Sequence, residues 1–182
     1  MIFRRLTQWT RFEWDLGKLP GNPALLPAHY AIRRATRDEK QTVWKVVNDS
    51  LALDPAWNEA FGELRPYLRV QIDELFDHSY RRDTEVGCCL ALTHGARIVG
   101  VSVLNLDPTA ENHLLTGPCV FSEYRNRGMG TCLLDRSLRE LRETGITRAY
   151  GVTKHSPAAR FVYPKFAGVS APYELEALLA AV

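Results

Sequence analysis

Several features that would place a protein in a definite class are missing from this sequence of 182 residues. No apolar run approaches the roughly 18 residues that a membrane-spanning helix needs, and residues 1–16 hold no uninterrupted apolar segment of the kind found in secretion signals. The formal net charge is only +2, and the basic residues are spread along the chain instead of forming a basic arm. We therefore expect a soluble, cytoplasmic protein that binds neither membrane nor nucleic acid.

The four cysteines lack the spacing of a zinc site. Cys88 and Cys89 are adjacent, whereas Cys119 and Cys132 lie singly among apolar neighbours. Such surroundings are typical of reduced, buried thiols, so we expect no structural metal. The phosphate-binding pattern G-x-x-x-x-G-K-[S/T] is absent too, and no complete G-x-G-x-x-G follows a strand.

The chain is long enough for one substantial core, and its composition changes near residue 30. We interpret residues 1–29 as an N-terminal extension and residues 30–182 as the main domain. In the extension, the alternation of Phe12, Trp14 and Leu16 predicts a short strand that packs on another part of the protein. We favour an arm that covers part of the core, and the alternative is a dimer contact or a lid over a site.

Hydrophobic periodicity predicts an α/β chain. The predicted strands are 30–35, 88–93, 98–106, 112–121 and 147–153. Helices are predicted over 37–53, 128–144 and 157–166. Another helix, between the first two of these, is predicted from an apolar stripe over 64–76. Thr36 and Glu39 form a capping box at the first helix. Gly117-Pro118 interrupts the fourth strand and predicts a bulge or a splay there.

The turn between the fourth strand and the third helix has the pattern R-x-x-G-x-G, from Arg125 to Gly130. A helix start presents N–H groups without intrahelical partners, together with the positive end of the helix dipole. Glycine allows a phosphate to approach the backbone closely, and arginines add positive charge. The turn therefore predicts a phosphate-bearing cofactor. The alternative is that its arginines pair with carboxylates such as Glu123 or Asp135.

The order of the elements and this turn resemble the GNAT acetyltransferase superfamily over residues 30–168. The lead-in 120–124 and the segment 98–100 are similar to the corresponding segments of that family. The resemblance implies an α/β (α+β) fold with helices flanking a mixed central sheet, and it implies acetyl-CoA as co-substrate without a metal. The residues that it implies for cofactor binding are Cys119, Val120, Phe121, Arg125, Asn126, Arg127, Gly128, Met129, Gly130, Thr131, Ser156 and Ala159.

The later part of the family pattern is incomplete. Ser156 stands where the family has an asparagine, and Gly168 arrives one residue late. The segment 169–182 is shorter than the two closing strands of the family normally require. We therefore expect a C-terminal sheet that is shortened, rebuilt from the N-terminal extension, or completed by another subunit, which leaves a homodimer open.

The resemblance implies acetyl transfer from a thioester to an amine by direct attack in a ternary complex. Such a reaction needs a neutral amine, a donor to the developing oxyanion and a proton for the departing thiolate. Tyr163 is the candidate acid by resemblance, and a backbone N–H near Val120 is the candidate oxyanion donor. Glu123 and His113 are the candidate bases, with a water relay as the alternative. Cys119 has no base beside it in the sequence, so we do not expect an acyl-cysteine intermediate.

The acceptor is the least determined part of this reaction. Acidic residues between 54 and 80 favour a cationic acceptor, either a small-molecule amine or a protein N-terminus or lysine. The incomplete family pattern supports a different hypothesis, in which the protein binds acyl-CoA without turnover as a sensor or interaction module. Tyr163 favours the enzyme over the sensor.

Overall fold

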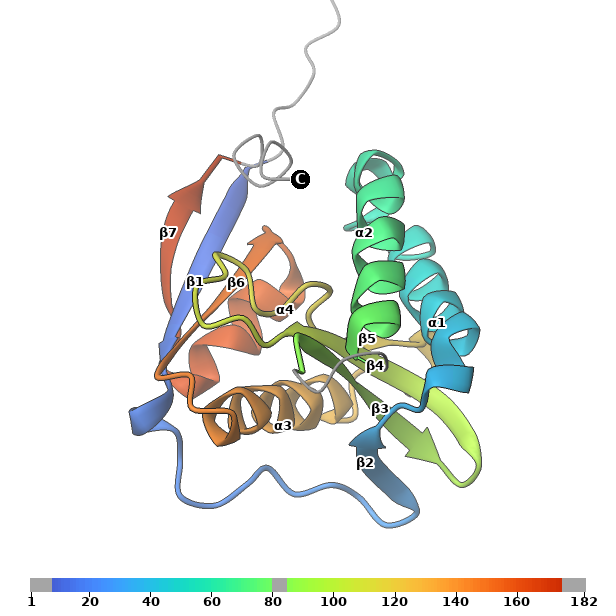
Figure 1. Cartoon of the computed structure of the whole chain (residues 1–182), viewed down its shortest axis with the longest axis horizontal. Helices are drawn as coiled ribbons and strands as arrows, with labels where there is room; N and C mark the ends of the chain where they lie inside the picture. The colour runs from blue at the N-terminus through green and yellow to red at the C-terminus, as the bar shows by residue number, and fades with distance from the viewer. Residues whose placement is uncertain (1–7, 80–84, 175–182) are drawn as a thin grey trace, which may run out of the picture.

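The computed structural model of the chain describes residues 8–79 and 85–174, which form two antiparallel sheets and four α-helices (Figure 1). The strands are β1 (Trp9–Asp15), β2 (Tyr30–Arg34), β3 (Gly87–His94), β4 (Arg97–Asn105), β5 (Cys119–Val120), β6 (Arg148–Lys154) and β7 (Val169–Tyr173). The helices are α1 (Lys40–Ala52), α2 (Asn58–Ser79), α3 (Met129–Glu143) and α4 (Pro157–Phe161). The 3₁₀ turns are η1 (Leu16–Lys18), η2 (Arg37–Glu39), η3 (Ser122–Tyr124) and η4 (Tyr163–Phe166). The predicted α/β fold is confirmed, with its sheet divided in two.

The larger sheet has the strand order β2-β3-β4-β5 and separates two hydrophobic layers. Side chains alternate along β3, so that Leu90 and Leu92 join the layer that contains α3, while Cys89 and Ala91 join the layer that contains α1 and α2. Figure 1 shows α1 and α2 on one side of this sheet and α3 on the other. Because both faces are covered, β3 and β4 are apolar along most of their length.

The N-terminal extension supplies the central strand of the smaller sheet, whose order is β6-β1-β7. β1 pairs antiparallel with both neighbours. Its Trp14 is completely buried, and the absent side chains of Gly151 and Gly168 make room for the indole ring, since an added Cβ at either residue would crowd it. Of the three arrangements expected for the closing sheet, the structure has the one rebuilt from the extension. The domain boundary at residue 29 stays a prediction.

β7 was not anticipated as a strand, because Pro172 falls inside it. Proline cannot donate to a sheet ladder and is therefore confined to edge strands and bulges. Among the residues that the structure describes, β7 lies at the edge of the smaller sheet and pairs with β1 alone. An edge position therefore accommodates the proline.

The two sheets meet near the middle of β6 and then separate. The N–H groups of His113 and Leu114 both donate to the Tyr150 carbonyl, at 2.8 and 3.2 Å. Leu114 also forms a bridge with Leu104 of β4, so it links the two sheets. Beyond this point the chain follows β4, and in the described part of the chain β5 pairs with β4 alone. One edge of β5 is therefore left open.

Gly117 and Pro118 form the predicted bulge. Between its pairings on either side, this strand carries two more residues than the facing segment of β4. The Val103 N–H donates to the Thr116 hydroxyl at 3.1 Å, where a regular ladder would use a backbone carbonyl. The strand expected over 112–121 is consequently reduced to an isolated bridge and the short β5.

The helix expected over 157–166 is divided in two. α4 ends at Phe161, and Tyr163 opens the separate turn η4. Pro164 accounts for the break, because a proline inside an α-helix lacks the N–H and clashes with the preceding turn. Among the described residues, no helix is both long enough and apolar enough to cross a membrane.

The segment between β1 and β2 runs along α3 (Figure 1). The Ala24 N–H donates to Asp135 Oδ2 at 2.9 Å, and the Arg139 guanidinium donates to the Pro20 carbonyl at 2.7 Å. Asp135 and Arg139 also pair with each other across one turn of α3. The extension is thus fastened to α3 as well as to the smaller sheet.

Candidate active site

The turn that joins β5 to α3 has the backbone of an anion site. Asn126 and Gly128 adopt left-handed conformations, with φ of 59° and 80°. Gly128 is the N-cap of α3 and provides no capping side chain, so the N–H groups of the first helical turn have no side-chain partner from the cap. A Cβ added to Gly128 or Gly130 would meet no atom within 4 Å. The N-terminus of α3 therefore opens onto free space, where an anion can reach the amides.

The two arginines of this turn play different parts. Arg125 is held within the protein, since its guanidinium donates to Val120 O at 2.9 Å, to Ser50 O at 2.6 Å and to Asp54 at 2.7 Å. Arg127 is exposed and has no hydrogen bond or ion pair with any residue that the structure describes. The side chain of Arg125 therefore fixes the turn against the end of α1, while Arg127 retains its charge for a ligand.

Tyr163 is buried between the smaller sheet and the bulge. Its ring makes edge contacts with Phe12 and Trp14, at centroid distances of 5.1 and 5.4 Å, and Trp14 Nε1 donates to its carbonyl at 3.3 Å. Its hydroxyl faces Gly117, where an added Cβ would collide with it. Burial raises the pKa of Tyr163 well above its ordinary value. The phenol is therefore protonated at neutral pH and can act as a donor.

A small cavity of about 40 Å³ lies beside Tyr163, between α2 and the smaller sheet. The side chains that line it come mainly from aromatic and aliphatic residues, with three polar residues where the two sheets separate. They are Trp9, Leu51, Trp57, Leu64, Tyr67, Leu68, Asn112, Leu115, Thr116, Val152, Thr153 and Tyr163. No carboxylate and no histidine is among them.

The acetyltransferase (GNAT) family matches residues 50–169, which is more than half of the chain. The chain belongs to this family. The matched segment contains the bulge, the turn at the start of α3 and Tyr163. It does not contain β1, so the central strand of the smaller sheet lies outside the family match.

Solved structures share the fold at low sequence identity. A Drosophila melanogaster protein is 14% identical with a TM-score of 0.61. The GCN5-related N-acetyltransferases of Kribbella flavida and Sphaerobacter thermophilus are 11% and 15% identical, both with a TM-score of 0.59. These matches cover 91–92% of this chain but only 48%, 56% and 49% of the three structures in the same order, so the chain spans about half of their length. No curated protein matches the chain by sequence.

The geometry favours neither candidate base of the GNAT reaction. His113 is completely buried, and its Nδ1 accepts from the Tyr150 N–H at 3.0 Å, which leaves the proton of the neutral ring on Nε2. Burial lowers the pKa of His113. Glu123 is exposed, and its pKa is lowered first by a backbone hydrogen bond and then by Arg97, with which it pairs at 3.3 Å. Neither side chain lines the cavity beside Tyr163.

The remaining predicted residues lie around the turn and at α4. Burial raises the pKa of the Cys119 thiol to about 12, so little nucleophilic thiolate exists near neutral pH. Phe121 stands between the Lys45 and Arg97 cations. Ser156 is the N-cap of α4, and its Oγ accepts from the Ala159 N–H at 3.2 Å. The serine thus caps this helix, a role that asparagine also fulfils well.

Sequence reasoning missed the residues that surround Tyr163 from other elements. Trp9, Trp57 and Tyr67 line the cavity but come from β1, from the turn before α2 and from α2. The alternation in the extension indicated that Phe12 and Trp14 would be buried, but it carried no information about their partner. No sequence signal pointed to the cavity itself, because its walls are distant in the chain.

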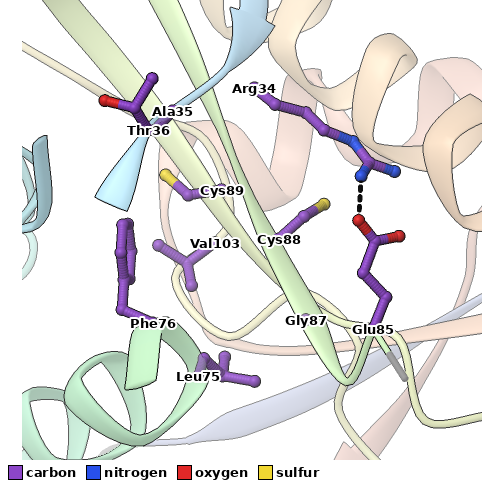
Figure 2. A pocket seen from close by; sticks show the side chains of 10 residues that line it. All are labelled: Arg34, Ala35, Thr36, Leu75, Phe76, Glu85, Gly87, Cys88, Cys89 and Val103. Carbon is purple, nitrogen blue, oxygen red and sulfur yellow. Dashed lines mark hydrogen bonds and ion pairs between the residues drawn. The ribbon is translucent and has the colours of Figure 1, made fainter. Parts of the chain in front are cut away.

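Two larger hollows lie away from Tyr163. One, of about 290 Å³, lies between the end of α2 and the strands β2 and β3, and Figure 2 shows Cys88 and Phe76 at its walls and the Arg34–Glu85 ion pair at one side. The other, of about 320 Å³, is a surface groove between α1 and η3. Within the described residues, no cluster of His, Cys, Asp or Glu could hold a metal ion.

Proposed function

We propose that this protein transfers an acetyl group from acetyl-CoA to an amine by direct attack within a ternary complex. One observation carries the proposal. The hydroxyl of Tyr163 lies against the bulge at Gly117, and from there the chain runs through the short β5 and η3 to the open N-terminus of α3. The candidate proton donor and the candidate anion site are thus joined by a short stretch of chain that includes a strand with a free edge.

The turn supplies the groups that would hold the cofactor. The pyrophosphate would accept hydrogen bonds from the amides at the start of α3, with the dipole of that helix and the unpaired Arg127 adding attraction. Glycine at positions 128 and 130 permits this approach, since no side chain stands over the amides. The pantetheine arm would follow the open edge of β5 from Phe121 back toward the bulge.

The same edge would stabilise the developing negative charge. The Phe121 N–H donates to Val99 O of β4, so the alternation of a strand directs the Val120 N–H toward the open edge. A thioester carbonyl placed there would receive this hydrogen bond as it becomes an oxyanion. Attack by the amine forms the C–N bond, and collapse breaks the C–S bond. Tyr163 would then donate its proton to the thiolate of coenzyme A, and the proton released from the attacking nitrogen would return to the phenolate through water.

The amine would lose its proton by desolvation. The cavity beside Tyr163 lacks a carboxylate among its described lining residues, so no negative charge there offsets the burial of an ammonium ion. Transfer of an amine into such a cavity favours its neutral form. Water carries the proton away, and the rate is expected to rise with pH as more of the acceptor becomes neutral.

Calorimetry of acetyl-CoA binding tests the proposal through a matched pair of glycines at the two ends of α3. Gly128 and Gly145 have φ of 80° and 91°, and an added Cβ meets nothing at either, so both Gly→Val variants carry the same backbone strain. We expect Gly128→Val to abolish measurable binding and Gly145→Val to retain it.

Equal binding by the two variants would show that the cofactor lies elsewhere. Absence of binding in the unmodified protein would contradict any acetyl-CoA function. Tight binding without release of coenzyme A in the presence of any amine would leave the acyl-CoA sensor in place of the enzyme.

A further inference from the structure

The cavity beside Tyr163 is walled by aromatic rings. Trp9 and Trp57 meet edge to face, with centroids 6.1 Å apart and an interplanar angle of 61°, and Tyr67 lines the cavity from α2. The volume of about 40 Å³ admits only a group of a few heavy atoms. An amine can enter it, whereas a larger group attached to the amine must remain at the aromatic rim. Flat or apolar groups pack favourably against such rings.

The acidic residues of α2 do not face this cavity. Asp73 pairs with Lys40 at 3.3 Å and with Arg69 at 2.9 Å, and Asp77 pairs with Lys40 at 3.5 Å. The cavity lining that the structure describes contains no carboxylate. The cationic acceptor expected from the acids between 54 and 80 therefore has no counter-charge here. A bound polyamine would have to place its additional ammonium groups where no carboxylate of the cavity lining can pair with them.

Two cations lie next to the cavity instead. Arg11 faces Val152 in the β1–β6 ladder, and Lys154 faces Trp9 in the same ladder, so both neighbour residues that line the cavity. Lys154 Nζ stands 5.9 Å from the centre of the Trp57 ring. Among the residues that the structure describes, neither cation has a carboxylate partner.

Two other basic residues near this sheet are already paired. Arg148 forms an ion pair with Glu13 across the same two strands, and Lys18 pairs with Asp15 at 3.1 Å. Arg11 lies instead over the rings of Tyr150 and Tyr173, at 5.0 and 5.8 Å from their centres. Arg11 and Lys154 thus offer unneutralised positive charge beside an apolar cavity.

We infer that the acceptor is an α-amino acid with an aromatic or large aliphatic side chain. Its amine and carboxylate are attached to one carbon atom, so an amine inside the cavity places the carboxylate at the mouth, toward Arg11 and Lys154. The side chain then packs on the rings of Trp9 and Trp57. This inference rests on the proposed acetyl transfer, because it names the acceptor for the same site.

A panel of matched amines tests the inference, with release of coenzyme A from acetyl-CoA as the readout. L-Phenylalanine and phenethylamine differ by the carboxylate, L-phenylalanine and glycine differ by the side chain, and spermidine represents a polycation. We expect kcat/KM for L-phenylalanine to exceed that for each of the others by about tenfold or more, the value of one charge-assisted contact or one buried apolar group. An equal or higher value for phenethylamine or spermidine would overturn the inference.

Two pairs of variants locate the contacts. Lys154→Met should reduce the preference for L-phenylalanine over phenethylamine by about tenfold, whereas Lys18→Met, which removes a paired lysine elsewhere, should leave it unchanged. Trp57→Leu should raise KM for L-phenylalanine. Trp44→Leu, at a tryptophan outside the cavity, should not. A preference that survives Lys154→Met would contradict the assigned carboxylate position.

Equilibrium binding separates this inference from the proposed function. Calorimetry with L-phenylalanine in the presence of coenzyme A should show binding that glycine and spermidine lack. Acetylation of spermidine without binding of L-phenylalanine would overturn the amino-acid acceptor and retain the transferase. Binding of L-phenylalanine without turnover would retain the ligand class and overturn the transferase.

Discussion

The position of Tyr163 depends on a residue that has no side chain. Gly117 has a φ of 60° and lies where the Tyr163 hydroxyl would meet any Cβ. The glycine therefore serves two purposes, since it permits the left-handed backbone of the bulge and leaves room for the phenol. The bulge in turn separates β5 from the preceding segment around Leu114, and β5 has the open edge along which we place the cofactor.

Gly117→Ala should lower both stability and activity. The positive φ costs about 1 kcal/mol for a residue with a Cβ, and the collision with Tyr163 displaces the phenol. Gly95→Ala is the matched control, because Gly95 has a φ of 58° and an added Cβ there meets nothing. In urea unfolding, we expect Gly95→Ala to be destabilised no more than Gly117→Ala. In steady-state assays, we expect Gly95→Ala to keep full activity. Full activity in Gly117→Ala would show that the tyrosine does not need this position.

Removal of the hydroxyl itself should affect only the chemical step. We expect Tyr163→Phe to lower kcat by about 10²-fold, within the usual range for general acid catalysis, with the dissociation constant of acetyl-CoA unchanged. Since burial raises the pKa of Tyr163, its proton is retained beyond about pH 10, and the unmodified enzyme should show no alkaline loss of activity from this group below that pH. Single-turnover rates measure the step, and an unaltered rate would remove Tyr163 as the acid.

At the scale of elements, β1 connects the smaller sheet to the candidate active site. It lies between β6 and β7, although it comes from the other end of the chain. Its inward residues Phe12 and Trp14 pack against Tyr163, and Trp9 lines the cavity. One strand thus contributes to the placement of the candidate acid and to the proposed acceptor site. An element outside the family match therefore lies at the centre of the proposed chemistry.

Trp14→Phe should destabilise the protein and slow catalysis. The variant loses the hydrogen bond from Nε1 to the Tyr163 carbonyl and leaves space around a completely buried ring, for a combined cost of about 2 kcal/mol. We expect a lower kcat with unchanged affinity for acetyl-CoA, because β1 belongs to the smaller sheet whereas the turn at α3 follows β5 of the larger sheet. Trp44 is a half-buried tryptophan on α1, and Trp44→Phe should change the free energy of unfolding by less than about 1 kcal/mol. Equal effects of the two substitutions would argue against a special role for β1.

At the scale of the whole molecule, the double-layered core buries thiols on both faces of the larger sheet. Burial raises the pKa of Cys88 and of Cys119 to about 12, and it raises the pKa of Cys89 and Cys132 as well. The folded protein therefore keeps these protons at pH values where the unfolded chain, with thiols near 9.0, releases them. The stability that this burial provides is complete below about pH 9 and declines as the pH rises toward 12.

Urea unfolding between pH 7 and 10.5 should show this decline, at up to about 1.4 kcal/mol per pH unit for each thiol. Cys119→Ala should make the decline shallower, because one of the contributing protons is removed. Stability that stays constant to pH 10.5 would contradict the deep burial of these groups. Acetyl-CoA alone should leave no acetyl group on Cys119 by mass measurement, since its thiolate is scarce at neutral pH.

Sequence analysis predicted the features that depend on nearby residues. The start of α3 is set by Gly128 and the apolar spacing that follows, and the bulge is set by Gly117 and Pro118. These are local conformational preferences, so neighbouring residues suffice to predict them. α1, α3 and the strands β2, β3, β4 and β6 lie within about three residues of their predicted bounds for the same reason. The break before Pro164 is missed because the helical spacing continues through it.

The arginine–glycine turn and the α/β order of elements therefore follow from the sequence, whereas Tyr163 as acid follows from the family resemblance and stays a prediction. Tertiary structure decided the rest. Arg125 pairs with Asp54, 71 residues away, and not with the nearby carboxylates that its position suggested. β1 enters a sheet with β6 and β7, and the cavity in which we place the acceptor is lined by residues from both ends of the chain. Such contacts result from burial of apolar faces that are remote in sequence, so only the folded chain reveals which of them meet.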